Sequence, residues 1–281
     1  MITIKVPATL GNFGPGIGSI GIALDWYLTV EVMGASEQWI VHHNLGDDVP
    51  TDDTNYLVAV AKKLSPTLTP HELRITSAIP RQQGLGSSKA ALIAAIELAN
   101  QLGELDLDDY TKLTLAARTA GQPANVTAAL LGGVTTSYLS AGQVFASGVV
   151  APAYQAVVYL AEPRTAVVEP PASIDYQTAV ATAAAGNMLL AAWQSQQILL
   201  AGQLLETPGL NGHTESAALA KIRQASHALD IYGTVVADRG PAIVTLVPSA
   251  QVTDFLDVVA HLSLPGEFKV VDIAMNGLQV I

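Results

Sequence analysis

A glycine- and serine-rich stretch between residues 79 and 103, IPRQQGLGSSKAALIAAIELANQLG, has the composition of a phosphate-binding loop. Gly84 and Gly86 permit backbone conformations that larger residues avoid, and Pro80 ends the strand expected before them. A helix should follow at once, so its unpaired amide N–H groups and its positive end would converge where no side chain blocks an anion. This arrangement predicts an anion site.

The same stretch is also compatible with an ordinary helix start. Ser87 or Ser88 could serve as the N-cap, and the run Ala90–Ala99 has strong helix formers with almost no charge, which predicts a buried helix. The Walker spacing is absent, because Lys89 follows the serines instead of preceding them. Taken alone, the stretch leaves both interpretations open.

The charge of the chain restricts what such a site could bind. The 281 residues carry a formal net charge of −11, and the 13 basic residues are scattered. Nucleic acids need clustered Lys and Arg, so we expect no nucleic-acid partner. A phosphate would have to be held by backbone amides, a metal ion or a few well-placed cations.

The composition predicts a compact, soluble protein. Half of the residues are hydrophobic, yet no uninterrupted apolar run approaches the roughly 20 residues that span a bilayer. The opening MITIKVPA lacks the pattern of a signal peptide, and the absence of cysteine excludes disulfides and thiolate metal sites. We therefore expect no membrane association and a cytoplasmic location.

Strand-like and helical segments alternate in an order that predicts an α+β fold, not a parallel doubly wound sheet. One alanine-rich segment, 173–202, could be a single long helix or a pair, and residues 130–150 look like a hairpin. A proline-rich stretch near 150–172 predicts a boundary between domains 1–155 and 156–281. Other expected strands are 1–7, 26–33, 38–43 after a turn, 74–79, 231–237, 242–247, 268–274 and 277–281; other expected helices are 54–64, 109–119, 214–229 and 250–262.

Four motifs, in order and together spanning nearly the whole chain, carry a resemblance. They are KVPATLGNFGPGIGSIGIALDWYL, IPRQQGLGSSKAALIAA, GQPANVTAALLGG and IYGTVVADRGPAIVTLV. In this combination the chain resembles the GHMP small-molecule kinase superfamily, and the homoserine kinases most closely. The resemblance implies an N-terminal domain like the second domain of ribosomal protein S5, a ferredoxin-like C-terminal domain, and ATP and substrate in the cleft between them.

The resemblance also implies individual roles. The nucleotide phosphates would meet Pro80, Gly84, Leu85, Gly86, Ser87 and Ser88. Ser88 would face Mg²⁺, and Asn55 would lie near the adenine. Asn12 and Asn125 would lie close to the phosphoryl acceptor, a small-molecule alcohol.

The three asparagines also have simpler interpretations. Asn12 precedes a Gly-Pro-Gly bend and could be a turn residue, because asparagine tolerates such geometry. Asn125 and Asn55 each stand near the start of an expected helix and could be caps.

Several positions depart from the family pattern at the metal and substrate sites. Ala120 replaces the glutamate that the resemblance places on the metal, and Gln122 and Ala124 replace a histidine and an aspartate. Gly18 stands where an aspartate would meet the substrate ammonium. Glu169 matches a substrate arginine, and GQLLETPGLNGH supplies no second one.

The last motif also departs from the family pattern, but here charged residues are gained instead of lost. Asp238 brings a carboxylate near the expected phosphates, and Arg239 adds a cation beside it. We expect Arg239 to replace part of the lost positive charge.

These departures leave three functions open. The first is an ATP-dependent homoserine kinase of threonine biosynthesis, with ATP and Mg²⁺ as cofactors. The second is a degenerate pseudokinase that binds a nucleotide or metabolite, and the third is a kinase whose acceptor lacks a carboxylate. The resemblance also allows a homodimer.

Overall fold

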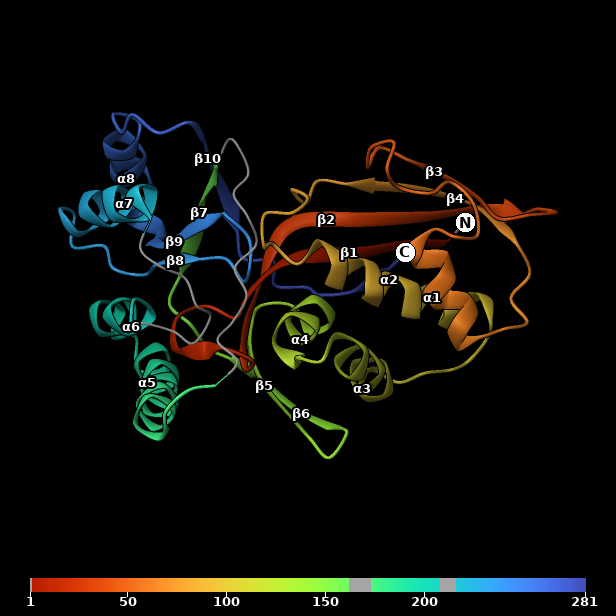
Figure 1. Cartoon of the computed structure of the whole chain (residues 1–281), viewed down its shortest axis with the longest axis horizontal. Coiled ribbons are helices and arrows are strands. Elements are labelled where there is room, and N and C mark those ends of the chain that lie inside the picture. Colours follow the sequence, from red (N-terminus) through yellow and green to blue (C-terminus); the bar gives the residue numbers. More distant parts are fainter. Residues whose placement is uncertain (1, 162–172, 208–215) are drawn as a thin grey trace.

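The computed structural model describes residues 2–161, 173–207 and 216–281, which form two sheets flanked by helices (Figure 1). The larger sheet has the order β11-β1-β2-β4-β3, with β5 paired to β2 and β6 to β5; the smaller has the order β10-β7-β9-β8. Within the described residues, β3 and β4 pair in parallel and the other strand pairs are antiparallel. The expected α+β fold is confirmed.

The larger sheet and its helices occupy the right-hand side of Figure 1. Its strands are β1 (Ile2–Gly11), β2 (Ile20–Ala35), β3 (Ile40–His43), β4 (His71–Ser77), β5 (Val134–Ser140), β6 (Gln143–Val149) and β11 (Gln279–Val280). The helices that pack with it are α1 (Tyr56–Leu64), α2 (Ser87–Leu102), α3 (Asp109–Ala120) and α4 (Pro123–Leu131).

The smaller sheet lies on the left-hand side of Figure 1, with α7 and α8 packed on one face. Its strands are β7 (Tyr154–Ala161), β8 (Thr234–Val236), β9 (Ile243–Pro248) and β10 (Gly266–Asp272). The remaining helices are α5 (Tyr176–Gln194), α6 (Ile198–Leu205), α7 (Ala217–His227) and α8 (Val252–Val259), and α5 packs against α6, the turn Gly14–Gly16 and β6. Short 3₁₀ turns lie at Gly14–Gly16 and Ser249–Gln251. The alanine-rich segment is therefore a helix pair, α5 and α6.

The chain crosses between the sheets more than once. After β10 it returns to the larger sheet, where β11 pairs with β1. The division into domains 1–155 and 156–281 stays a prediction. Among the described helices, none has both the length and the apolar character of a membrane span.

β3 follows β2 through a turn, as expected, and it pairs in parallel with β4. One strand expectation needed correction. β2 begins at Ile20, earlier than the expected residue 26, because its first residues pair with β1 on one side and β5 on the other. Helix α4 packs over this start. A Cβ atom on Gly21 would lie 2.2 Å from the carbonyl oxygen of Ala124, so only glycine permits this helix to pack so closely.

Helix α2 is the buried helix that the sequence predicts. Its residues Ala90 and Leu92–Ala99 are buried, including the charged Glu97, whose carboxylate lies 2.7 Å from the Lys112 ammonium. The expected serine N-cap is wrong, because the N-cap is Gly86 in a left-handed conformation with φ +74°. Ser87 and Ser88 are therefore the first two residues of the helix.

The glycine turn before α2 meets the turn after β8 in a contact that leaves no space for side chains. A Cβ atom on Gly84 would lie 2.0 Å from the Ala237 carbonyl oxygen, and one on Gly240 would lie 2.1 Å from the Gly84 nitrogen. The Ala242 amide donates a hydrogen bond of 3.3 Å to the Gln83 carbonyl. This contact joins the two sheets at one end of α2.

Gly84→Ala should lower the free energy of unfolding by about 3 kcal/mol, because the new methyl group adds a clash to the strain of a positive φ. Gly133→Ala is the matched control, since Gly133 also has a positive φ but a Cβ atom there meets nothing within 4 Å. We expect a loss of about 1 kcal/mol for the control. Urea denaturation measures both, and equal losses would contradict the tight contact.

Candidate active site

The structure brings the six predicted phosphate-binding residues together around one cavity of about 320 Å³. Its lining includes Pro80, Gly84, Leu85, Gly86, Ser87 and Ser88, and Lys89 and Asp238 join them. The cavity opens at the start of α2, whose first amide N–H groups have no partner within the helix. These amide groups and the positive end of the helix suit an anion. The role of the six residues as nucleotide ligands stays a prediction.

The loop before α2 is fixed on strand β1. The Thr9 amide donates a hydrogen bond of 3.1 Å to the Leu85 carbonyl. A Cβ atom on Gly86 would lie 2.0 Å from the Thr9 hydroxyl oxygen, so residue 86 must be glycine. The start of α2 is thus held in place by β1, while the exposed Ser88 lies on the side of the cavity.

Asn12 connects three of the four sequence motifs. Its side-chain nitrogen donates to Gln122 Oε1 at 2.7 Å and to Asp238 Oδ1 at 3.0 Å, and its side-chain oxygen accepts from the Gly18 amide at 2.8 Å. It is 4% exposed and has φ +55°, which asparagine tolerates. Asn12 is therefore a turn residue, in agreement with the simpler interpretation, and its side chain also makes three hydrogen bonds that join separate segments.

A second cavity, of about 370 Å³, adjoins the first. It is lined by Lys89, Ala120, Gly121, Gln122, Asp238 and Arg239. Lys89 and Asp238 line both cavities, and the Lys89 ammonium lies 3.7 Å from Asp238 Oδ2. Lys89 was not among the predicted site residues, although a charged residue in the first turn of a buried helix is a signal for such a role.

Two predicted site residues lie apart from both cavities. Asn125 is buried in α4, and a Cβ atom on Gly11 would lie 2.5 Å from its side-chain oxygen, which has no hydrogen-bond partner among the described residues. Asn55 caps α1 by accepting from the Leu57 amide at 3.1 Å, and it donates to the Pro50 carbonyl. Capping explains Asn55, but Asn125 is not the N-cap of α4, which is Gln122.

The positions expected to bind the substrate carboxylate are mostly outside the described residues. Glu169 falls in the segment 162–172, and the stretch matched to the second arginine is described only to residue 207. Gly18, where the resemblance places an aspartate for the substrate ammonium, lies beside Asn12, and a Cβ atom there would meet nothing within 4 Å.

Arg81 lies at the rim of the phosphate cavity, where Asp48 holds it. Two hydrogen bonds, of 2.9 and 2.7 Å, join its guanidinium to the Asp48 carboxylate. These bonds hold the pKa of Asp48 at about 2, well below its usual value. Arg81 is therefore a guanidinium already engaged by a carboxylate.

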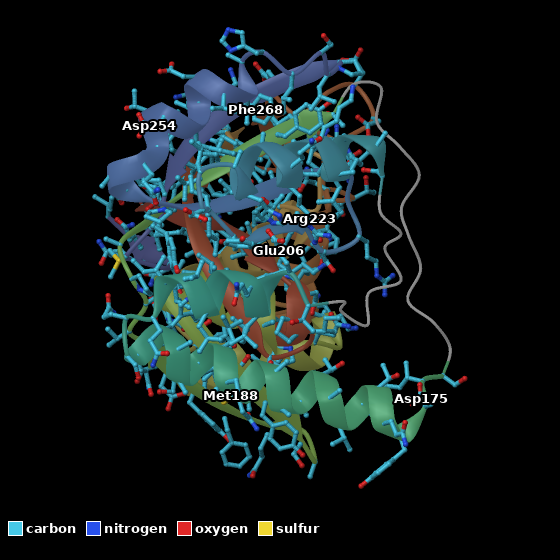
Figure 2. The ribbon with its side chains drawn as sticks, turned by 90° about the vertical axis from the view of Figure 1, so that its left-hand side faces the viewer. Asp175, Met188, Glu206, Arg223, Asp254 and Phe268 are labelled. Carbon is cyan, nitrogen blue, oxygen red and sulfur yellow. The ribbon has the colours of Figure 1, made fainter. Side chains whose placement is uncertain are left out.

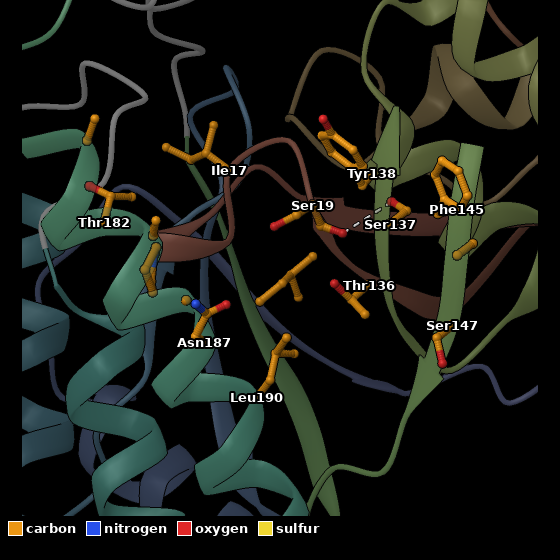
Figure 3. A pocket seen from close by; sticks show the side chains of 16 residues that line it. Ile17, Ser19, Thr136, Ser137, Tyr138, Phe145, Ser147, Thr182, Asn187 and Leu190 are labelled. Atoms are coloured by element: carbon orange, nitrogen blue, oxygen red, sulfur yellow. Dashed lines mark hydrogen bonds between the residues drawn. The ribbon is translucent and has the colours of Figure 1, made fainter. Parts of the chain in front are cut away.

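A third cavity, of about 590 Å³, lies between the turn Gly14–Gly16, the hairpin β5–β6 and α5 (Figure 3). It presents hydroxyl groups such as those of Ser19, Thr136 and Ser147, and the stacked pair Tyr138–Phe145. No charged side chain lines it among the described residues. It offers no counter-charge to a phosphate, so we do not assign the nucleotide to it.

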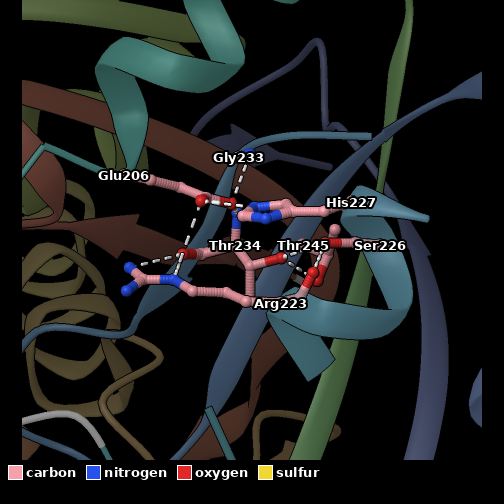
Figure 4. Close-up of polar contacts among 7 residues, drawn as sticks. All are labelled: Glu206, Arg223, Ser226, His227, Gly233, Thr234 and Thr245. Carbon is pink, nitrogen blue, oxygen red and sulfur yellow. Dashed lines mark hydrogen bonds and ion pairs between the residues drawn. The ribbon is translucent and has the colours of Figure 1, made fainter. Parts of the chain in front are cut away.

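The Glu206 carboxylate and its partners anchor the start of strand β8 (Figure 4). The turn that follows this strand carries Asp238. Glu206 Oε1 accepts from the Gly233 and Thr234 amides, each at 2.9 Å, and Oε2 lies 2.7 Å from His227 Nε2. Arg223 donates to the Thr234 carbonyl and lies 3.8 Å from the same carboxylate. Figure 2 shows Glu206 and Arg223 close together between α6 and α7.

Comparison with known proteins identifies what the chain is similar to. Residues 55–133 match the family model described as the GHMP kinases N terminal domain. A homoserine kinase from Leuconostoc mesenteroides is 35% identical over 100% of this chain and 99% of that protein, and one from Limosilactobacillus fermentum is 37% identical over 94% of each.

Solved structures agree with these sequence relatives. The structure of a homoserine kinase from Listeria monocytogenes superposes with a TM-score of 0.93, at 31% identity, over 100% of this chain and 99% of that one. A mevalonate diphosphate decarboxylase from Staphylococcus aureus has a TM-score of 0.74 at 15% identity over 100% and 98% of the chains, which shows a shared fold only.

Glu206→Gln should lower the free energy of unfolding by about 2 kcal/mol, because it weakens several charge-assisted contacts of a side chain that is only 11% exposed. Glu267→Gln is the control, since its pair with Lys269 is exposed, and it should change the free energy by less than about 0.5 kcal/mol. Thermal and urea denaturation measure both. A Glu206 variant as stable as the control would contradict an anchoring role.

Proposed function

We propose that this chain, which belongs to the homoserine kinases of the GHMP kinase family, transfers the γ-phosphoryl group of ATP to the hydroxyl group of homoserine. The products would be ADP and O-phosphohomoserine, a step of threonine biosynthesis. The observation that carries the proposal is the cavity at the start of α2, where the six phosphate-loop residues meet Lys89 and Asp238.

The described residues suit phosphoryl transfer, which depends mainly on positioning and charge neutralisation. Amide N–H groups at the start of α2 would bind phosphate oxygens, and the Lys89 ammonium would add a positive charge. In the reaction the homoserine oxygen would form a bond to the γ-phosphorus, the bond from that phosphorus to the ADP oxygen would break, and the hydroxyl proton would pass to water. Asn12, with its contacts to three motifs, would hold the acceptor end of the site in shape.

The donors around the phosphate cavity also fit a magnesium ion. The Ser88 hydroxyl and the carboxylate of Asp238 line the same cavity, and Mg²⁺ prefers oxygen ligands, commonly one or two carboxylates together with substrate phosphates. Bound with ATP, the ion would neutralise charge on the phosphates. Ser88 is the residue that the sequence analysis assigned to it.

Arg239 supports the proposal from the acceptor side of the site. It lines the second cavity together with Lys89 and Gln122. Homoserine carries a carboxylate, and the position that the resemblance gives to an arginine holds Glu169. We infer that Arg239 supplies part of the missing positive charge. The cytoplasmic location and the homodimer stay predictions.

The proposed function predicts ADP release by the purified protein that depends on homoserine in the presence of Mg-ATP. Ser88→Ala should lower kcat/KM by about tenfold or more, the effect of one lost polar contact in the transition state. Ser36→Ala, in the turn between β2 and β3, is the control and should retain full activity. No homoserine-dependent release by the wild-type protein, together with nucleotide binding, would favour the pseudokinase or another acceptor.

Arg239→Ala should raise the KM for homoserine or weaken ATP binding by about tenfold, because it removes one of the few cations near the site. Arg239→Lys, which keeps the charge, should restore much of the loss. Steady-state kinetics and calorimetry separate the two effects. Unchanged values for both ligands would exclude a role for this cation.

A further inference from the structure

Lys89 and Asp238 form a charged pair in the wall that the two cavities share. The Lys89 ammonium and the Asp238 carboxylate are 3.7 Å apart, with side chains 30% and 13% exposed. Among the described residues that line either cavity, Asp238 is the sole carboxylate. A bound triphosphate would therefore meet this carboxylate and its lysine directly.

The position of Asp238 is maintained by its surroundings. Its backbone has φ +42°, a conformation that costs a residue other than glycine about 1 kcal/mol. The Asn12 side chain donates to Oδ1, and the turn that carries Asp238 is packed on Gly84 through Gly240. Strain that persists at a binding cavity, held by several contacts, points to a functional role for the residue.

The charge of Asp238 conflicts with a nucleotide unless a cation lies between them. Carboxylate and phosphate oxygens at close range repel each other, and Lys89 can neutralise only part of the combined charge. A divalent cation removes the conflict, because Mg²⁺ bridges one or two protein carboxylates and the phosphates of a nucleotide. A carboxylate beside a phosphate cavity is thus better suited to a metal than to the phosphate itself.

Asp238 lies in the wall that the two cavities share, and the second cavity extends from it to α3. Ala120, at the end of α3, lines the second cavity together with Asp238. A cation beside Asp238, at the shared wall, would therefore face the turn between β8 and β9 on one side and the end of α3 across the second cavity. On α3 the side chain is the methyl group of Ala120, and in the turn between β8 and β9 it is the carboxylate of Asp238.

We propose that Asp238 supplies the protein carboxylate for the divalent cation of the bound nucleotide, and that Lys89 is its counter-ion in the absence of that cation. This inference rests on the proposed function, because it concerns the ATP of that reaction. The metal ligand would then come from the turn between β8 and β9, in the smaller sheet, while the phosphates bind at the start of α2, in the larger one. The contact between Gly84 and Gly240 holds these two segments together.

The test measures ATP affinity by calorimetry, once with MgCl₂ and once with EDTA, for the wild-type protein, Asp238→Asn and Asp238→Gly. We expect Mg²⁺ to tighten binding to the wild-type protein by about tenfold or more, the effect of one charge-assisted contact, and to have little effect on either variant. In EDTA the variants should bind ATP at least as tightly as wild type, because a repulsive carboxylate is gone. Both substitutions tolerate a positive φ, so both proteins should fold.

Asp257→Asn is the matched control, since Asp257 is exposed on α8 and lines none of these cavities. It should keep the full Mg²⁺ effect. The second readout is the electron paramagnetic resonance of Mn²⁺ with ADP, which reports the protein–metal contact without turnover. Its spectrum should change on adding the wild-type protein and the control, but not the Asp238 variants.

An Asp238 variant that keeps the wild-type Mg²⁺ effect would overturn the assignment, even if its activity is lost, since the carboxylate would then act in another way. ATP binding by the wild-type protein that ignores Mg²⁺ would overturn it as well. Neither result contradicts the kinase function, which fails separately if the wild-type protein releases no ADP with homoserine. Recovery of the Mg²⁺ effect in Asp238→Asn/Ala120→Glu would support the assignment strongly.

Discussion

The contact between the glycine turns at Gly84 and Gly240 is the constraint on which the site depends. Neither turn can carry a side chain there, because a Cβ atom on either glycine would lie within about 2 Å of the backbone opposite. The contact places the start of α2, from the larger sheet, against the turn after β8, from the smaller one. Both cavities open at this junction, and Asp238 faces Lys89 only because of it.

The site also reflects how an acidic protein can bind a phosphate. With 13 basic residues in the chain, the described structure places amide N–H groups, one lysine and one exposed arginine around the cavities. Arg81 is at the rim but is engaged by Asp48. Few positive charges therefore surround the cavities, and they do not balance the charge of a triphosphate together with the Asp238 carboxylate. A divalent cation bound at Asp238 would supply the missing positive charge.

Much of this architecture could be predicted from local patterns. The glycine turn, the buried α2, the hairpin β5–β6 and the α+β order all follow from residue type and period, which act over short distances. Contacts between distant segments could not be predicted. The early start of β2 depends on its pairing with β1 and β5, and β3 pairs with β4 in place of its sequence neighbour β2. Asn125 is buried by its packing over Gly11. The pairing of Lys89 with Asp238 required the two sheets to be placed relative to each other.

The most direct test of the account is a crystal structure of the protein with a non-hydrolysable ATP analogue and Mn²⁺, located by its anomalous scattering. We expect the triphosphate along the first turn of α2, between Gly84 and Lys89, with the metal peak between its phosphates and the Asp238 carboxylate. A nucleotide bound away from this junction, in the uncharged cavity beside α5 for example, would contradict it.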